Sequence, residues 1–255
     1  MTAHKQGAVL NALTTSFVKR LRDRDESAWF ELWEVFGPVL RAQLAKWGKG
    51  RIGVETVRDL TQETLAALSD SIERYDPSRG ARFSTWLLSI AKHALGDEMD
   101  RRMALKRGGG RKATEFDERF MSKAATVEAD DAYEANVFRA KVYASIRKVE
   151  QESEFVTFQV YRMRVFDGMA GREVAEHLGV SEPTVSRYLQ KVRVQIKRRL
   201  SETIATYSFT DEEVAEADRA GLSGEDQMFD EALADIYHTQ SRLVLEDQRA
   251  ASQSY

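Results

Sequence analysis

The sequence contains no cysteine and only 3 prolines and 15 glycines among its 255 residues. Without cysteine the chain can form neither a disulfide nor a thiolate metal site, which fits a reducing compartment. It has no continuous apolar run of the length that a membrane span needs, and its N-terminal residues lack the apolar stretch of a signal peptide. These absences predict a cytoplasmic protein without membrane insertion.

Alternating runs of β-branched residues are also scarce, whereas apolar residues recur at helical spacing along most of the chain. The hydrophobic fraction of 42% is enough for real cores. We therefore expect an all-α protein. The pattern predicts two small helical domains joined by a flexible linker, the second a helix-turn-helix domain, and then a short helical C-terminal extension.

The net charge of −3 hides a strong asymmetry along the chain. Residues 201–255 hold 13 acidic and 3 basic residues, a balance of −10, whereas residues 1–200 carry +7. A basic body with an acidic end is typical of a protein that binds a polyanion through the basic part and weakens that binding through the acidic part.

A helix-turn-helix is predicted in "GMAGREVAEHLGVSEPTVSRYLQKVRVQIKRRL", residues 168–200. Gly179 stands where a left-handed cap ends a helix, because glycine has no Cβ to clash there. Ser181 suits the N-cap of the next helix, and Pro183 lies in its first turn, where a missing N–H costs nothing. The second helix buries an apolar stripe and turns a polar, basic face outward.

That outer face favours DNA binding over an ordinary helical hairpin with a solvated surface, the alternative that the pattern leaves open. Threonine, serine, arginine and glutamine near the N-terminus of the helix can reach base edges, and the run "KRRL" at its end suits phosphates. The residues of this face are Thr184, Ser186, Arg187, Gln190, Lys191, Lys197 and Arg198.

Five further helices are expected before this motif: over residues 25–48, over 55–75, from Phe83 into a basic cluster near 101–112, over 132–149 and over 154–166. The turn "DPSRGAR" separates the second from the third. The glycine-rich stretch at 108–110 follows no strand, so we interpret it as linker and not as a nucleotide-binding loop. The predicted domains are 20–105 and 132–201, with a linker at 106–131 and an acidic C-terminal extension at 202–255.

The stretch "DLTQETLAALSDSIERYDPSRGARFSTWLLSIAKHALGDEMDRR" resembles region 2 of bacterial RNA polymerase sigma factors, especially the extracytoplasmic-function class. An acidic-amide helix face, a "YDPSRG" loop and a helix with a basic end follow one another as in that family. The helix-turn-helix resembles sigma region 4. The resemblance implies a sigma factor that binds the RNA polymerase core and directs initiation at −10 and −35 promoter elements.

The resemblance also implies roles for single residues. By this resemblance, the residues expected to dock on the polymerase clamp are Asp59, Gln62 and Glu63. The residues expected to bind DNA at the −10 element are Tyr75, Arg79, Arg82, Phe83, Trp86, Lys92, Arg101 and Arg102. The residues expected to bind DNA at the −35 element are Arg172, Thr184, Ser186, Arg187, Gln190, Lys191 and Arg198. For Trp86 a plain core position is an equally good interpretation. The chain departs from the family at Thr64 and Leu65, where an aromatic is usual, and at His93.

Two other classes of protein compete with this interpretation. A helix-turn-helix regulator with a helical sensor or dimerisation domain would bind duplex DNA without docking on polymerase. A DNA-processing enzyme such as a recombinase would need a cleavage constellation, and none precedes the motif. Asp59 and Glu63 have no partner for acid–base work, and the four histidines lack metal-ligand spacing. We expect no enzyme activity and no cofactor. Beyond polymerase core and promoter DNA, an anti-sigma factor or other regulator is an open partner.

The acidic extension itself is expected to hold two short helices, the first capped by Thr210 and stopped at Gly221, the second capped by Ser223. The second carries an apolar stripe of Phe229, Leu233, Ile236, Tyr237 and Val244, interrupted by Gln240. Such helices cannot bury these faces alone. Three interpretations stay open: masking of the basic helix at 187–199, a solvated tail, or a docking segment for another protein.

Overall fold

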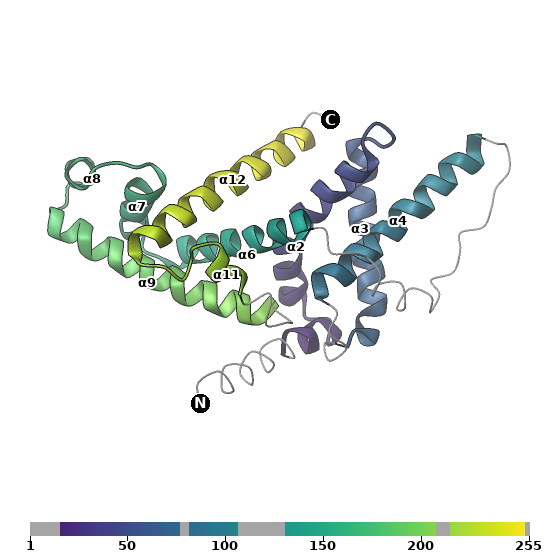
Figure 1. Cartoon of the computed structure of the whole chain (residues 1–255), viewed down its shortest axis with the longest axis horizontal. Coiled ribbons are helices and arrows are strands. Elements are labelled where there is room, and N and C mark those ends of the chain that lie inside the picture. Colours follow the sequence, from purple (N-terminus) through teal and green to yellow (C-terminus); the bar gives the residue numbers. More distant parts are fainter. Residues whose placement is uncertain (1–15, 77–81, 107–130, 208–214, 253–255) are drawn as a thin grey trace. The chain divides into compact units, whose positions relative to one another are not determined.

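The computed structural model describes residues 16–76, 82–106, 131–207 and 215–252 (Figure 1). Within these ranges every regular element is a helix, which confirms the all-α prediction. None of these helices is both long and apolar enough to cross a membrane. The described residues form two compact units, and the division falls between Val137 and Phe138, inside α6 (Asp131–Glu152), and again after Glu246.

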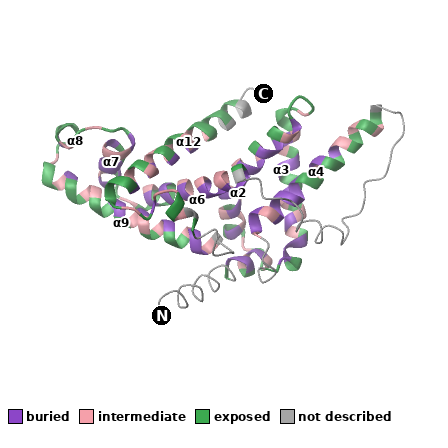
Figure 2. Ribbon diagram, in the orientation of Figure 1, coloured by how far each residue is buried: buried purple, intermediate pink, exposed green. Residues whose placement is uncertain are grey.

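The N-terminal unit contains a helical segment at 16–22, then α2 (Glu26–Gly48), α3 (Val54–Ser71), the short 3-10 helix η1 (Ile72–Arg74) and α4 (Phe83–Lys106). The three long helices each bury one apolar stripe, as their spacing predicts. Figure 2 shows this buried face along them. The core residues include Leu21, Leu32, Phe36, Leu40, Leu44, Leu60, Leu68, Leu87 and Ile90.

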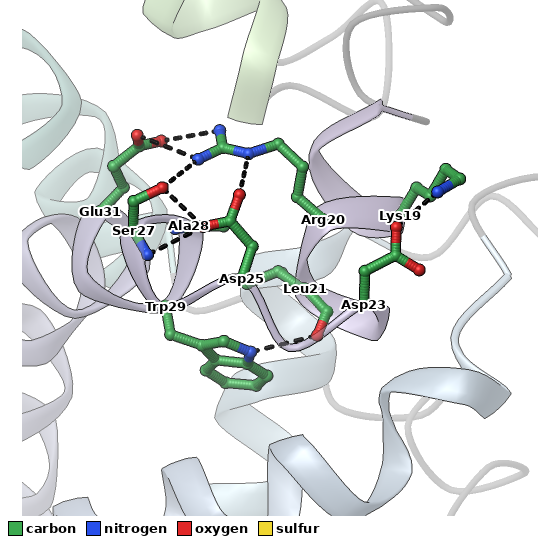
Figure 3. A network of polar contacts seen from close by, with 9 residues as sticks. All are labelled: Lys19, Arg20, Leu21, Asp23, Asp25, Ser27, Ala28, Trp29 and Glu31. Atoms are coloured by element: carbon green, nitrogen blue, oxygen red, sulfur yellow. Dashed lines mark hydrogen bonds and ion pairs between the residues drawn. The ribbon is translucent and has the colours of Figure 1, made fainter.

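A polar network fixes the beginning of α2 (Figure 3). The carboxylate of Asp25 accepts from the backbone N–H of Ser27 (2.9 Å), from the hydroxyl of Ser27 (2.6 Å) and from Arg20 Nε (2.8 Å). These hydrogen bonds hold the pKa of Asp25 well below its ordinary value. Trp29 Nε1 donates to the carbonyl of Leu21 at 3.1 Å, so the segment 16–22 is tied to the first turn of α2.

The C-terminal unit consists of the rest of α6, α7 (Phe155–Tyr161), a π-helical turn η3 (Arg162–Phe166), α8 (Gly171–Leu178), α9 (Glu182–Tyr207), the one-turn α11 (Glu216–Arg219) and α12 (Asp226–Ser252) as far as Glu246. Its main core draws residues from α6, α7, α9 and α12 alike. The buried members include Phe138, Val142, Ile146, Phe158, Val192, Ile196, Leu200, Leu222, Phe229, Leu233 and Ile236.

The C-terminal extension is therefore built into this unit. Phe229 and Leu233 on α12 are fully buried, and Tyr237 stacks on Phe166 with ring centroids 4.0 Å apart. Gly221 lies just after α11 and has a φ of 80°. Glycine is favoured at such a positive φ. The second helix begins at Asp226, two residues later than the Ser223 cap predicts, because residues up to Gly224 still form a turn. Thr210 lies outside the described residues.

Candidate nucleic-acid and polymerase interfaces

The helix-turn-helix is built as the sequence predicts. Gly179 has a φ of 66°, in the left-handed region, and ends α8. Val180 N–H then donates to the carbonyl of Ala175 at 3.0 Å, and Val185 N–H donates to the carbonyl of Ser181 at 3.0 Å to open α9. The turn thus needs only two residues between the glycine and α9, and it fixes the angle at which α9 leaves α8.

A small apolar cluster holds the two helices of the motif together. Its buried members are Val160, Met163, Val174, Ala175 and Val185, and partly buried residues from the turn and from α9 pack against it. Val185 is buried on the inner side of α9, whereas Ser186, Arg187 and Gln190 lie on the other side of the helix and are exposed.

The predicted base-reading face of α9 is available to a ligand. Ser186, Arg187, Gln190 and Lys191 are exposed, and Thr184 is half-buried. Arg187 Nη2 donates to Thr184 Oγ1 at 3.1 Å, which holds the guanidinium over the first turn of α9. The structure therefore brings these five side chains to one end of the helix.

The two arginines expected to flank that face are exposed too. Arg172, in the first turn of α8, pairs with Glu176 at 2.9 Å across one helical turn. Arg198, near the middle of α9, lies 3.7 Å from Glu202. Exposed pairs of this kind contribute little to stability, so either arginine can exchange its partner for a phosphate.

A set of ion pairs joins α9 to α12. Arg193 Nη2 lies 2.6 Å from Asp230 Oδ2, Arg193 Nη1 lies 2.9 Å from Asp226 Oδ2, and Lys197 Nζ lies 2.9 Å from Asp226 Oδ1. The ammonium of Lys197 also sits over the ring of Phe229, 4.8 Å from its centroid. Two cations of the basic helix thus have acidic partners supplied by the extension.

The charges of this set are coupled. The hydrogen bond to Asp230 raises the pKa of Arg193, and the hydrogen bond from Lys197 lowers the pKa of Asp226, with the charge of Arg193 acting in the same direction. Tyr161 Oη donates to Asp230 Oδ1 at 2.8 Å, and burial raises the pKa of Tyr161 well above its ordinary value. Arg193 is only 8% exposed, so its pairing is a partly desolvated one.

In the N-terminal unit, the expected docking residues share one exposed face of α3. Asp59, Gln62 and Glu63 are all exposed. Their neighbour Thr64, at the position where an aromatic is usual, is buried and donates its hydroxyl to the carbonyl of Leu60 at 2.7 Å. The face therefore consists of carboxylates and an amide above a closed, apolar underside.

The basic end of α4 lies against α3. Glu98 is buried and pairs with Arg102 Nε at 2.5 Å and with Arg101 Nη1 at 2.9 Å. Arg102 is fixed further, because its Nη2 donates to Thr56 Oγ1 at 2.8 Å. Arg101 remains mostly exposed, 3.9 Å from Glu63. Of the predicted backbone contacts, Lys92 and Arg101 are exposed, whereas Arg102 also anchors α4 to α3.

The three aromatic residues expected to capture a base lie in the core. Tyr75 stacks on Trp86 with centroids 4.8 Å apart, and Phe83 meets Tyr75 edge-on at 5.4 Å. Each is at most 3% exposed. The alternative of a core position for Trp86 agrees with this burial. In this conformation the rings pack against one another, and base stacking by them stays a prediction that requires them to leave the core.

Their contact brings together the two ends of the loop that the sequence singled out. Tyr75 precedes this loop and Phe83 follows it, whereas Arg79 lies outside the described residues. Arg82, at the far end of the loop, is largely buried and lies 3.4 Å from the carboxylate of Glu134. Ser84 Oγ lies 2.8 Å from the same carboxylate, so Glu134 also binds the first turn of α4.

Five charged residues of these sites were not singled out in the sequence: Glu98, Glu134, Arg193, Asp226 and Asp230. Glu98 is buried and pairs with the end of its own helix, whereas the other four pair with residues far away in the chain. The charge asymmetry of the extension is a signal only for the pairs of Arg193, and it does not identify them. Among the described residues, no group of histidine, aspartate and glutamate side chains could hold a metal ion.

Comparison with known families matches two parts of the chain. Residues 34–104 match the model of sigma-70 region 2, and residues 156–196 match the model of sigma-70 region 4. The first match covers the predicted docking face on α3 and most of α4, and the second covers the helix-turn-helix. No curated protein and no solved structure shows a significant match.

Proposed function

Because the chain belongs to the sigma-70 family, as an extracytoplasmic-function-type sigma factor with regions 2 and 4, we propose that it binds the RNA polymerase core and directs initiation at promoters with −10 and −35 elements. Promoter recognition itself follows from the family. The observation that supports the finer proposal most is the pair of exposed faces, one acidic on α3 and one basic on α9, that coincide with the two matched regions.

Core binding is assigned to the face of Asp59, Gln62 and Glu63. Carboxylates and an amide on one exposed helix face suit a basic, hydrogen-bonding partner surface. Because α3 is held from beneath by Leu60, Thr64 and Leu68, the face is rigid before the partner arrives. A preformed face loses little conformational entropy on binding.

Recognition of the −10 element is assigned to segment 20–105. Lys92 and Arg101 are exposed on α4 and supply phosphate contacts. Capture of a base of the melted strand is assigned to Tyr75, Arg79, Arg82, Phe83 and Trp86. The three aromatic residues among them pack on one another at the two ends of the stretch that contains Arg79.

Recognition of the −35 element is assigned to segment 132–201. Thr184, Ser186, Arg187, Gln190 and Lys191 lie at the N-terminal end of α9, the part of a recognition helix that enters the major groove. Arg172 and Arg198 add contacts to the phosphates. An anti-sigma factor or another regulator remains a proposed further partner.

Co-purification with polymerase tests the proposal. The chain with Asp59→Ala, Gln62→Ala and Glu63→Ala should fold, because alanine is the best helix former and the three sites are exposed. It should lose the core enzyme in a pull-down with purified core. The matched control is Glu34→Ala with Asp97→Ala, which removes two exposed carboxylates elsewhere on the same unit.

The control should keep the core enzyme. If the triple variant keeps it equally well, the docking face is wrongly placed. If the unaltered chain does not bind the core at all and binds duplex DNA alone, the chain acts as a conventional helix-turn-helix regulator instead.

A further inference from the structure

The side chain of Gln190, in the base-reading face, contacts the buried arginine that α12 holds. Arg193 Nη1 lies 2.5 Å from Gln190 Oε1, 2.9 Å from Asp226 Oδ2, and on the same guanidinium Nη2 lies 2.6 Å from Asp230 Oδ2. From this arrangement, and resting on the proposed function, we propose that Arg193 is a positioning residue that sets the orientation of the Gln190 amide and thereby the base pair that it selects.

The orientation of the amide follows from the chemistry of its partner. A guanidinium has only hydrogen-bond donors, so the amide atom that faces Arg193 must be the acceptor, Oε1. The Nε2 group, on the same carbon, is then turned away from Arg193. An exposed glutamine without such a partner would sample both orientations of its amide, and it could present either a donor or an acceptor to DNA.

The extension keeps Arg193 in this position. Nε donates to Asp230 Oδ1 at 3.1 Å, so Asp230 engages two nitrogens of the guanidinium, and Tyr161 fixes Asp230 in turn. The side chain is nine-tenths buried. Arg193 therefore does not serve as a phosphate contact, and its Nη1 group, which has two hydrogens, donates to both Gln190 and Asp226.

A fixed amide donor has a defined preference in the major groove. Guanine presents two acceptors there, O6 and N7, whereas the bidentate pairing of glutamine with adenine uses both its donor and its acceptor. With Oε1 held by Arg193, Gln190 favours a base edge that offers acceptors, guanine above all. Loss of Arg193 frees the amide to turn and relaxes that choice.

The test uses holoenzyme assembled from core polymerase and the full chain, transcribing a library with a randomised −35 element. Gln190→Ala should lower the preference at one base pair by about threefold to tenfold, the effect of one hydrogen bond. Arg193→Met should relax the same base pair and no other. In the double variant the preference should match that of Gln190→Ala alone, because Arg193 acts through Gln190.

Lys197→Met is the matched control, because Lys197 pairs with the same Asp226 but lies one turn further along α9. It should leave the preference at that base pair unchanged. If Arg193→Met does not fold, Arg193→Met with Asp230→Asn removes both charges and still lets residue 230 accept from Tyr161. A folded Arg193 variant with unaltered base preference, or with an equal loss at all positions, overturns the proposal. Absence of promoter selection by the unaltered holoenzyme would instead overturn the proposed function.

Discussion

Arg193 on α9 and Asp230 on α12 form a two-point ion pair, with Nη2 2.6 Å from Oδ2 and Nε 3.1 Å from Oδ1. This pair joins the basic helix to the acidic extension. It engages the middle of α9 and leaves Ser186, Arg187 and Lys191 exposed. This arrangement indicates that α12 stabilises the helix-turn-helix unit. It does not favour the alternative that α12 covers the predicted base-reading face.

The first prediction concerns the burial of α12. Phe229→Ala should lower the free energy of unfolding of the C-terminal unit by about 3–5 kcal/mol, because it leaves a cavity in the shared core. Chemical denaturation of the full chain, followed by circular dichroism, measures the change. Met228→Ala is the control, since Met228 is 58% exposed beside it on the same helix. Equal stability of the two variants would mean that α12 does not pack on this core in solution.

The second prediction concerns acid pH. The pKa of Asp226 is lowered in the folded chain, so its pairing stabilises the fold fully above its ordinary pKa of about 3.9 and less as the pH falls through that value toward the lowered one. Between pH 5 and pH 3, taken as about one unit on either side of that pKa, the unaltered chain should therefore lose more stability than Asp226→Asn. Urea unfolding at each pH measures the difference, which added salt should reduce. Parallel pH profiles for both proteins would contradict it.

Most of the helices could be predicted from the sequence, because each buries a stripe at helical spacing. The position of the turn at Gly179 could be predicted to the residue. A glycine that ends one helix and a serine that caps the next are compatible with few backbone conformations other than this turn. The beginning of α12 could not, because Gly221 and Gly224 extend the turn beyond Ser223. Packing of α12 in the core was not among the three interpretations of the extension, because the spacing of Phe229, Leu233 and Ile236 shows only that one helix face is apolar and not which surface buries it.

The third prediction concerns Glu134. Its carboxylate accepts from Ser84 Oγ and pairs with Arg82, all within the N-terminal unit. Glu134→Ala should lower the stability of this unit by about 1.5–3 kcal/mol, the cost of losing buried hydrogen bonds to a charged group. Thermal melting against Glu55→Ala, an exposed residue paired with Arg58, provides the comparison. A change no larger than that of the exposed control would show that Glu134 does not stabilise the beginning of α4.

The fourth prediction separates base contacts from phosphate contacts on α9. Arg187→Ala should lower holoenzyme affinity by about 1–3 kcal/mol for promoters that carry one particular base pair. Arg198→Ala should weaken binding to all promoters alike and reduce the slope of affinity against salt by about one. Binding to a promoter series at several salt concentrations gives both quantities. Unaltered sequence preference for Arg187→Ala would show that the recognition face is wrongly placed.

The candidate sites could be predicted only in part from the sequence. Asp59, Gln62, Glu63 and the N-terminal face of α9 are exposed as expected, because helical spacing separates a polar face from a buried one. The aromatic residues could not be assigned in this way. Tyr75 and Phe83 flank a loop, and an aromatic ring at such a position can either pack in the core or stack on a base. Only the three-dimensional contacts show which of these two roles each ring has. Arg193 looks like any basic residue of α9 until its carboxylate partners on α12 are known.

The most direct test of the account is transcription in vitro with core polymerase, in the presence and absence of the full chain, on a promoter library with mapped start sites. The account predicts that the chain makes the core initiate at a defined subset of promoters that share −10 and −35 sequences, while the chain alone binds those duplexes weakly. Start sites that do not change when the chain is added, together with tight and specific duplex binding by the chain alone, would contradict it.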